Sequence, residues 1–365
     1  MGIKGLNKWL KDAYPLAIRG INKSNKFTYD NVYIDLNYII HCIHYKAVNE
    51  DDMINKFVNY IRYYIKCYRP VKKLFMCFDG KLSKIKKFTV DKRIEMNKKR
   101  DYNVDYDIFK YGSEFMKRLD TMIKSWDNSF LGVGDSVDIV YNDYNENGEG
   151  EIKIYREILK CDERDRNLII CNDSDLIVIG MLVDRDIDIL MFQTSNKEVY
   201  LVKLNIIKLQ YRNQYNDHYY DFVLLSILNG NDYFPKLKYV TFENIWNAYK
   251  NYINCECILN SDDIELMKAN NIVWNGMMEK KNYYLVNPDG EINMDNFKVF
   301  IWYLYKEMKP IKKHGGSLVL NCRKNTRKYI EIVNYCLRMY RCEGSCGCDI
   351  EYCEGMIHPI IFLVD

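Results

Sequence analysis

The chain has 365 residues, of which 48% are hydrophobic and 28% are charged, so it can bury a sizeable globular core. Its net charge of only +3 excludes a global basic bias, so any signal for nucleic acid must be local. Because no apolar run could span a bilayer and Lys4, Lys8 and Lys11 interrupt the first residues, we expect no membrane partner and no signal peptide. We place the protein inside the cell as a soluble chain, in the cytoplasm, with the nucleus as the alternative.

Three short apolar segments that run into carboxylates indicate buried strands. VYIDLNYII begins at Val32, LFMCFDG ends at Asp79–Gly80, and NLIICNDSDLIVIG leads into Asp173 and Asp175. Between the first two, residues 51–68 form a predicted amphipathic helix, whose apolar face consists of Met53, Ile54, Phe57, Val58, Ile61, Tyr64 and Ile65. Strand, helix and strand of this kind predict a parallel βαβ unit, and hence an α/β fold with a parallel sheet flanked by helices.

Residues 81–100 are a basic segment that contains Lys81, Lys84, Lys86, Lys87, Lys92, Arg93, Lys98, Lys99 and Arg100 against only Asp91 and Glu95. Lys86 and Arg93 are seven residues apart and share a face of the predicted helix, where they could hold a phosphate group. The plainer interpretation is a solvated helix face. Further helices are expected over residues 115–126 and 219–229, and the chain is mostly helical after Pro235.

Carboxylates gather at predicted strand ends and turns, namely Asp35, Asp79, Glu149, Glu151, Asp173, Asp175 and Asp232. The carboxyl ends of parallel strands meet at one edge of a sheet, and such a cluster cannot ionise fully without cations. Hard oxygen ligands suit Mg²⁺, with Mn²⁺ as the alternative, and one or two such ions could promote hydrolysis of a phosphodiester. Gly148 and Gly150 would let the backbone turn so that both glutamates face the cleft. For any single pair, a solvated turn or a helix N-cap is an equal alternative.

The order of these motifs resembles the Xrn-type 5′→3′ exoribonucleases, within the flap-endonuclease-like (PIN-like) nuclease superfamily. The matching stretches are WLKDAYP, YIDLNYIIH (33–41), FMCFDG (75–80), GSEFM (112–116), GEGEIKI (148–154), NDSDLIVIGM (172–181), DFVLLSILNGNDYFPKL (221–237) and YYLVNPDGEINMDNFKVFIWYL (283–304). The resemblance therefore covers the chain up to about residue 305. The short length and the Lys-, Asn-, Ile- and Tyr-rich composition are typical of a small AT-rich genome, such as that of a virus.

The resemblance implies a nuclease domain over residues 1–240 and a mostly helical extension over 241–365, truncated relative to the family. It implies that all seven acids bind the catalytic metal, that Lys86 and Arg93 bind the 5′-phosphate, and that His41 stacks on the first base. The implied substrate is single-stranded RNA with a 5′-monophosphate, degraded to 5′-mononucleotides. A decapping enzyme or a pyrophosphatase would be the partner that prepares such ends.

Several positions depart from the family pattern. Val90 and Ile94 stand where the family carries a Gln and a second Arg, and Ile152 replaces a His. The segment 329–352 is a trace of the family's second conserved region and lacks the Trp that would oppose His41. Two other functions therefore stay open: a flap-type structure-specific DNA nuclease, and a non-catalytic RNA-binding scaffold. The stretch after Asp232 lacks the glycines of a DNA-gripping helix-hairpin-helix, which favours RNA over the first of these.

The cysteines are interpreted mainly as buried thiols of a reducing compartment, such as Cys77 and Cys171. Near the C-terminus, Cys342, Cys346, Cys348, Cys353 and His358 lie close together in the sequence. Their spacings do not form a clean pair of CxxC knuckles, so a zinc site is the less favoured alternative to thiols in a small helical tail.

Overall fold

The computed structural model describes residues 2–3, 5–22, 25–81, 83–98, 102–193, 198–254, 283–308 and 323–342. The chain divides into two compact units. The sheet unit comprises Tyr14–Ile207 and Gly347–Asp349, and the helical unit comprises Met1–Ala13, Lys208–Cys346 and Ile350–Asp365. The chain therefore starts in the helical unit, crosses to the sheet unit and returns. The nuclease-domain boundary at residue 240 is a separate assignment and stays a prediction.

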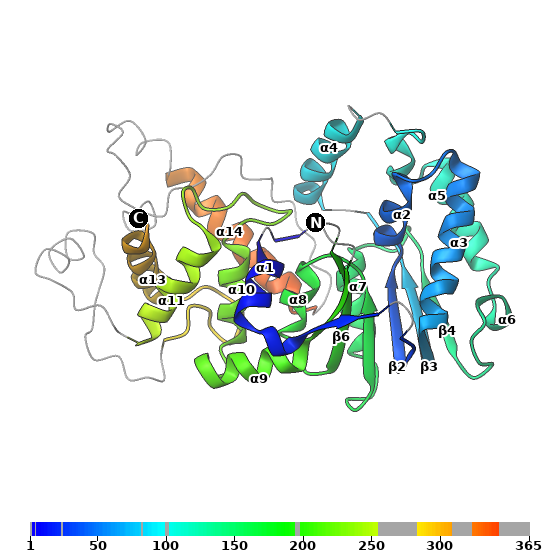
Figure 1. Cartoon of the computed structure of the whole chain (residues 1–365). Coiled ribbons are helices and arrows are strands. Elements are labelled where there is room, and N and C mark those ends of the chain that lie inside the picture. The colour runs from blue at the N-terminus through cyan, green and yellow to red at the C-terminus, as the bar shows by residue number, and fades with distance from the viewer. Residues whose placement is uncertain are drawn as a thin grey trace, which may run out of the picture. The chain divides into compact units, whose positions relative to one another are not determined.

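The sheet unit is built on a seven-stranded sheet in the order β1-β7-β6-β5-β2-β3-β4 (Figure 1). The strands are β1 (Ile18–Ile21), β2 (Phe27–Asp35), β3 (Tyr68–Cys77), β4 (Asp138–Asn142), β5 (Arg166–Ile170), β6 (Asp186–Gln193) and β7 (Glu198–Lys203). Neighbouring strands pair in parallel along the order β6-β5-β2-β3-β4, which confirms the α/β prediction. The three apolar segments predicted as strands form β2, β3 and β5. The sheet is mixed rather than wholly parallel, because β7 and β1 add an antiparallel edge.

Helices cover both faces of this sheet. On one face, α2 (Leu36–His44), α3 (Glu50–Cys67) and α5 (Glu114–Lys124) share a hydrophobic core with the strands (Figure 1). The predicted apolar face of α3 is confirmed, since Met53, Phe57 and Ile61 are fully buried there. On the other face lies α7 (Gly150–Ile158), next to α8 (Asp175–Gly180). A short helix, α6 (Asn128–Leu131), and two 3-10 turns, η1 (Pro15–Ala17) and η2 (Tyr106–Phe109), complete the unit.

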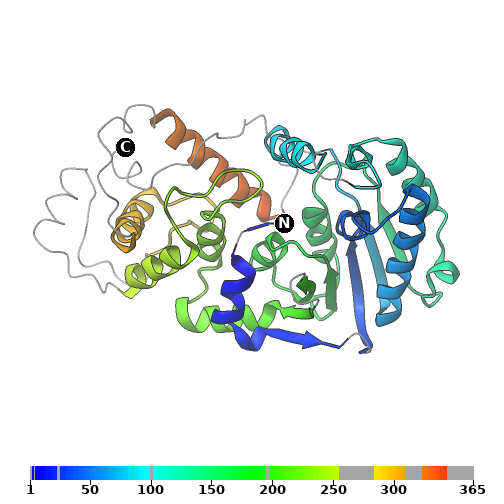
Figure 2. The ribbon, with the colours of Figure 1, turned by 45° about the horizontal axis from the view of Figure 1, so that its top comes forward.

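The predicted basic helix is α4 (Lys84–Lys98), which lies beyond the carboxyl ends of β2 and β3 (cyan in Figure 2). Its start is supported by Ser83, whose hydroxyl accepts a hydrogen bond from the Lys86 amide at 3.4 Å. Within this helix, Ile85 and Lys86 are buried, whereas Lys84 and Lys87 are exposed. The face that carries Lys86 is therefore not the solvated one, which is the first structural reason to assign Lys86 a function.

The helical unit contains α1 (Leu6–Ala13), the end of α9 (Leu204–Tyr215), α10 (Tyr219–Ile227), α11 (Phe242–Asn254), α13 (Met294–Glu307) and α14 (Arg323–Tyr340). Its core is aromatic: Trp9 of α1 stacks on Trp246 of α11 with ring centroids 4.3 Å apart. The mostly helical prediction after Pro235 is confirmed for the part of this region that the structure describes. No helix among the described residues is both long and apolar enough to cross a membrane.

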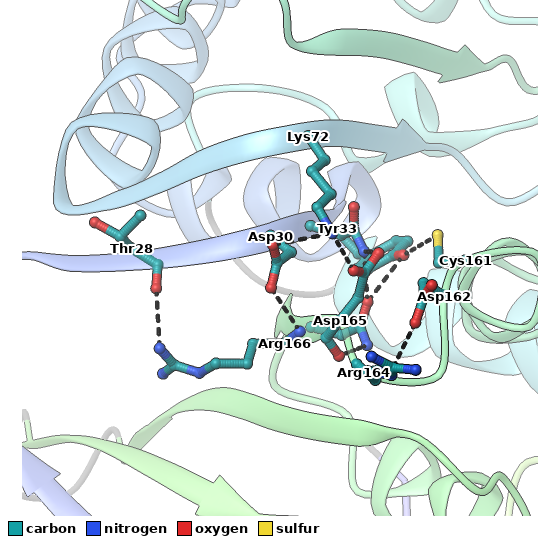
Figure 3. Close-up of polar contacts among 11 residues, drawn as sticks. Thr28, Asp30, Tyr33, Lys72, Cys161, Asp162, Arg164, Asp165 and Arg166 are labelled. Atoms are coloured by element: carbon teal, nitrogen blue, oxygen red, sulfur yellow. Dashed lines mark hydrogen bonds and ion pairs between the residues drawn. The ribbon is translucent and has the colours of Figure 1, made fainter.

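A polar network lies around the start of β5 (Figure 3). Asp173 and Asp175 follow the other end of this strand. Asn31 donates to Asp165 and to Asn167, both at 3.0 Å, and Lys72 pairs with Asp165. Although burial pushes it upward, these partners hold the pKa of the Asp165 carboxyl below its usual range. The charges here are balanced within the protein, as expected of a structural cluster.

Candidate active site

The carboxyl end of β2 positions Asp35. This residue is the N-cap of α2, and its Oδ1 accepts the Tyr38 amide at 3.2 Å. Its other oxygen, Oδ2, accepts a hydrogen bond from the Cys171 thiol at 3.0 Å. Burial and the neighbouring charge of Asp79 raise the pKa of Asp35 above its usual range. The helix-cap alternative is thus correct for Asp35, and the same carboxylate also faces another acid.

Asp79 follows β3 and meets Asp35 beside Gly150. Its Oδ1 accepts the Gly150 amide at 2.6 Å. A Cβ placed on Gly150 would lie 3.2 Å from Asp79 Oδ1 and 3.7 Å from Asp35 Oδ1, so both carboxylates approach the same point. The predicted turn is confirmed at Gly148, which has φ +105°. Gly150 is instead the first residue of α7, and it lies close to both acids.

Glu149 and Glu151 stand at the start of α7, where Glu149 is the N-cap. Glu149 Oε2 pairs with Lys86 Nζ at 2.6 Å, and both side chains are mostly buried. Glu151 is 8% exposed, and its Oε2 has no hydrogen-bond partner among the described residues. Burial raises the pKa of Glu151 well above its usual range; the charge of Lys86 opposes this rise, and Asp79, Asp173 and Glu149 add to it.

Asp173 and Asp175 follow β5, the strand beside β2, where the strand order of the sheet reverses. Such switch points are where open α/β sheets place ligands. Asp173 Oδ1 accepts the Asp175 amide at 3.0 Å, and the Asp173 amide points to the Cys171 sulfur at 3.4 Å. The six acids of the sheet unit therefore gather at one edge, and the charges of Asp79 and Asp173 act on both Asp35 and Glu151.

Two side chains that sequence reasoning did not assign to this site, Cys171 and Lys153, hold the acids and the adjacent loops in place. Cys171 fixes Asp35, as described, although the sequence marked it only as a buried thiol. Lys153 of α7 is 6% exposed and donates to the carbonyls of Phe78, at 2.9 Å, and Asp143, at 3.1 Å. It thereby ties the loops after β3 and β4 to the helix that carries Glu151. A lysine inside the apolar run EIKIY was the signal that could have revealed it.

The cluster offers oxygen ligands but not a finished coordination sphere. Among the described residues, no three His, Cys, Asp or Glu side chains already surround one point as metal ligands. One of the carboxylates, Glu149, already pairs with Lys86. The raised pKa of Asp35 and the partnerless Glu151 oxygen mark an excess of negative charge that a divalent cation fits.

His41 and Arg93 lie beside this cluster in the sheet unit. His41 is in the last turn of α2, and its ring centroid is 4.4 Å from that of Phe109. Burial and the charge of Arg93 lower the pKa of His41 to about 4, whereas Asp79 raises it. His41 is therefore neutral near pH 7, and the charges of Arg93 and Asp79 act on it in opposite directions.

Asp232 belongs to the helical unit, in the turn after α10. Gly230 has φ +88°, and a Cβ there would lie 2.6 Å from the Lys236 amide. Asn231 Oδ1 then accepts the Tyr233 amide at 2.9 Å, which closes the turn around Asp232. The assignment of Asp232 to the metal site stays a prediction.

The C-terminal cysteine prediction is tested only in part. Cys342 is buried at the end of α14, while Cys346, Cys348, Cys353 and His358 lie outside the described residues.

Comparison with known proteins finds similar sequences and similar solved structures. The chain is 22% identical to 5′-3′ exoribonuclease 1 of Schizosaccharomyces pombe, over 87% of this chain and 29% of that protein. It is 25% identical to human 5′-3′ exoribonuclease 1, over 50% of this chain and 12% of that protein. The chain thus spans less than a third of the length of these relatives. Among solved structures, it is similar to the catalytic core of Rad2 in complex with DNA, with 14% identity, a TM-score of 0.47 and coverage of 97% and 91%.

The family described as "XRN 5′-3′ exonuclease N-terminus" matches residues 1–92 and 81–191, which together make up more than half of the chain and contain six of the seven acids. Given this match, the order of the motifs and the acids at the sheet edge, the chain belongs to the XRN 5′-3′ exonuclease family.

Proposed function

We propose that the protein is a metal-dependent 5′→3′ exoribonuclease that hydrolyses single-stranded RNA with a 5′-monophosphate and releases 5′-mononucleotides. The observation that carries the proposal is the approach of Asp35 and Asp79 to one point, beside the partnerless oxygen of Glu151. Family membership supports the direction of attack, and the similarity to proteins named 5′-3′ exoribonuclease supports the choice of RNA. Magnesium is the proposed cation and manganese the alternative, because the donors are hard carboxylate oxygens.

The cation would be held by the acids at the sheet edge, namely Asp35, Asp79, Glu149, Glu151, Asp173 and Asp175. We propose Asp232 as a further ligand of this cation. When bound, the cation would supply charge neutralisation at the phosphodiester and a more acidic water. The protein's own part is to keep the carboxylates fixed: the Tyr38 amide and the Cys171 thiol orient Asp35, and the Gly150 amide orients Asp79. Fixed ligands need little reorganisation when the substrate binds.

Lys86 and Arg93 are proposed to receive the 5′-phosphate, since both lie at the acid edge of the sheet unit. Lys86 pairs with Glu149, and Arg93 acts electrostatically on His41. A monophosphate end requires an enzyme that removes a cap or a pyrophosphate, which is why a decapping enzyme or a pyrophosphatase is the proposed partner. We place this reaction in the cytoplasm.

Cleavage of four labelled single strands with Mg²⁺ tests the proposal: 5′-monophosphate RNA, 5′-hydroxyl RNA, 5′-triphosphate RNA and 5′-monophosphate DNA. We expect stepwise loss of mononucleotides from the monophosphate RNA alone. Equal degradation of DNA, or cuts only at duplex junctions, would instead identify a flap-type nuclease. Binding of RNA without any cleavage would identify a scaffold.

The Asp173→Asn variant is the matched control for this assay. It keeps the size of the side chain and the acceptor for the Asp175 amide, but it removes one negative charge from the cluster. We expect cleavage to fall at least about a hundredfold, while RNA binding is unchanged or tighter because repulsion of phosphate decreases. Cleavage at the wild-type rate would show that the acids are assigned to the wrong site.

A further inference from the structure

Helix α2 carries two histidines on the side that faces residues 102–109. His44 is 3% exposed, and its Nε2 makes a hydrogen bond of 2.8 Å with the Val104 carbonyl. Val104 and Ile108 are buried in the core of the sheet unit. The segment that leads into η2 is thus held by the hydrogen bond to His44 of α2 and by the burial of Val104 and Ile108.

Tyr106 and Phe109, here called the aromatic bracket, come from this anchored segment and contact His41. The Phe109 ring lies nearly parallel to the imidazole, with centroids 4.4 Å apart and planes at 28°. The Tyr106 hydroxyl lies 3.4 Å from His41 Nδ1, and its ring is inclined to the imidazole by 27°. The bracket thereby covers one face of the imidazole and one of its nitrogens.

The contacts of His41 leave it suited to stacking rather than to proton transfer. The ring is neutral near pH 7, and its Nδ1 and the Tyr106 hydroxyl share a hydrogen bond of 3.4 Å that holds the ring in place. His41, Tyr106 and Phe109 are all only partly buried, so the group reaches the surface of the sheet unit. Arg93, a proposed ligand of the 5′-phosphate, acts on the same imidazole. The first base of a bound strand is one sugar away from that phosphate.

We propose that Tyr106 and Phe109 are positioning residues that hold His41 as a one-sided platform for the first base of the RNA. The stack would run from Phe109 through His41 to the base. Phe109 would thus support the imidazole from the side away from the base, and we assign no described aromatic residue of the sheet unit to the far side of the base. Every base has a π-face, so such a platform accepts all four bases. This inference rests on the proposed function, because it concerns the seating of an RNA 5′ end.

Two RNAs with a 5′-monophosphate test the platform, one with an ordinary first nucleotide and one with an abasic ribose in its place. We expect the wild-type protein to prefer the ordinary RNA about tenfold in kcat/KM, mainly through KM, as the loss of one base–aromatic stack predicts. Phe109→Leu should reduce this preference to about twofold, and Phe109→Tyr should restore it, because the ring is what supports the imidazole. Tyr106→Phe should give an intermediate preference.

Tyr111→Leu is the matched control, since Tyr111 is a 59% exposed aromatic residue of the same segment that contacts Tyr144 rather than His41. It should leave the preference at the wild-type value. A Phe109→Leu variant that keeps the tenfold preference would overturn the proposal, as would a wild-type protein without any preference.

Binding of the same two RNAs to the Asp173→Asn variant, with and without Phe109→Leu, gives the ratio without cleavage. If the wild-type protein cleaves neither RNA, the exoribonuclease function fails, while the ratio of dissociation constants still decides for or against the platform. Equal affinities for the two RNAs in Asp173→Asn would overturn it.

Discussion

The buried ion pair between Lys86 and Glu149 joins a residue predicted to hold phosphate to a residue predicted to hold metal. In this pairing, Lys86 supplies positive charge that the carboxylates need, and it lowers the pKa of Glu151 against the effect of burial. A divalent ion at the same acids would repel the ammonium group. We propose that Lys86 and such an ion would compete for Glu149, and that release of Lys86 would make it available to a phosphate.

The Lys86→Met variant tests this competition. Without the ammonium group, we expect the Mg²⁺ concentration for half-maximal thermal stabilisation to fall roughly three- to tenfold. The same variant should melt at a lower temperature in EDTA, because a mostly buried carboxylate loses its partner. Thermal-shift titrations with Mg²⁺ measure both effects.

Lys87→Met provides the comparison, since Lys87 is an exposed neighbour on the same helix. It should change neither quantity. Unchanged or weaker Mg²⁺ binding by Lys86→Met would contradict the competition, whereas a wild-type protein that Mg²⁺ does not stabilise would contradict the metal site itself.

Helix α10 is joined to residues 283–286 by a fully buried carboxylate. Asp221 Oδ1 accepts the amides of Leu285, at 2.9 Å, and Val286, at 3.0 Å, and Oδ2 accepts the Tyr249 hydroxyl at 2.8 Å. Burial nevertheless raises the pKa of Asp221 to about 7, and these hydrogen bonds only limit the rise. The contact between α10 and residues 283–286 thus depends on the Asp221 carboxyl, which changes charge near neutral pH.

This raised pKa predicts how the stability of the helical unit depends on pH. The folded state binds the Asp221 proton more tightly than the unfolded state, whose pKa is about 3.9. The stabilisation from this tighter proton binding is complete below about pH 4 and is lost as the pH rises through about 7. The free energy of unfolding then falls by no more than about 1.4 kcal/mol per pH unit.

The Asp221→Asn variant lacks the titration but keeps an acceptor for the two amides. Its melting temperature, relative to the wild type, should therefore rise between pH 5 and pH 8. A difference that is constant over this range would show that Asp221 keeps one charge state.

On the scale of the whole molecule, the first helix of the chain, α1, belongs to the helical unit, whose other residues begin at Lys208. Trp9 contacts Phe242, at 5.3 Å between centroids, and Trp246, at 4.3 Å. The helical unit is thus assembled from residues on both sides of the sheet unit in the sequence.

Trp9→Ala should lower the free energy of unfolding by about 2 kcal/mol, less than for a fully buried tryptophan because Trp9 is half-buried. Hydrogen exchange should accelerate in α10 and α11 and stay slow in β2 and β5. Trp126→Ala is the counterpart in the sheet unit, where Trp126 packs near Phe57 and Phe130, and it should have the opposite pattern. Faster exchange of β2 in Trp9→Ala would contradict the assignment of α1 to the helical unit.

The sequence determined the strands that end in carboxylates, because apolar runs and the acids after them are local patterns. The βαβ unit, the face of α3 and the basic helix could be predicted for the same reason, and the ordered motifs indicated the family. The sequence also predicts that Asp35, Asp79, Glu149, Glu151, Asp173 and Asp175 lie near one another, because parallel strands bring their carboxyl ends together.

Only the tertiary structure decided the partners of these residues. The pairing of Lys86 with Glu149, the thiol of Cys171 on Asp35 and the bracket behind His41 each join residues that are distant in the sequence. The antiparallel edge and the place of α1 were likewise decided by packing, since α1 buries its apolar side against aromatic residues that come more than 200 positions later. Local patterns fix which groups are present, whereas side-chain partners depend on long-range packing that no local pattern encodes.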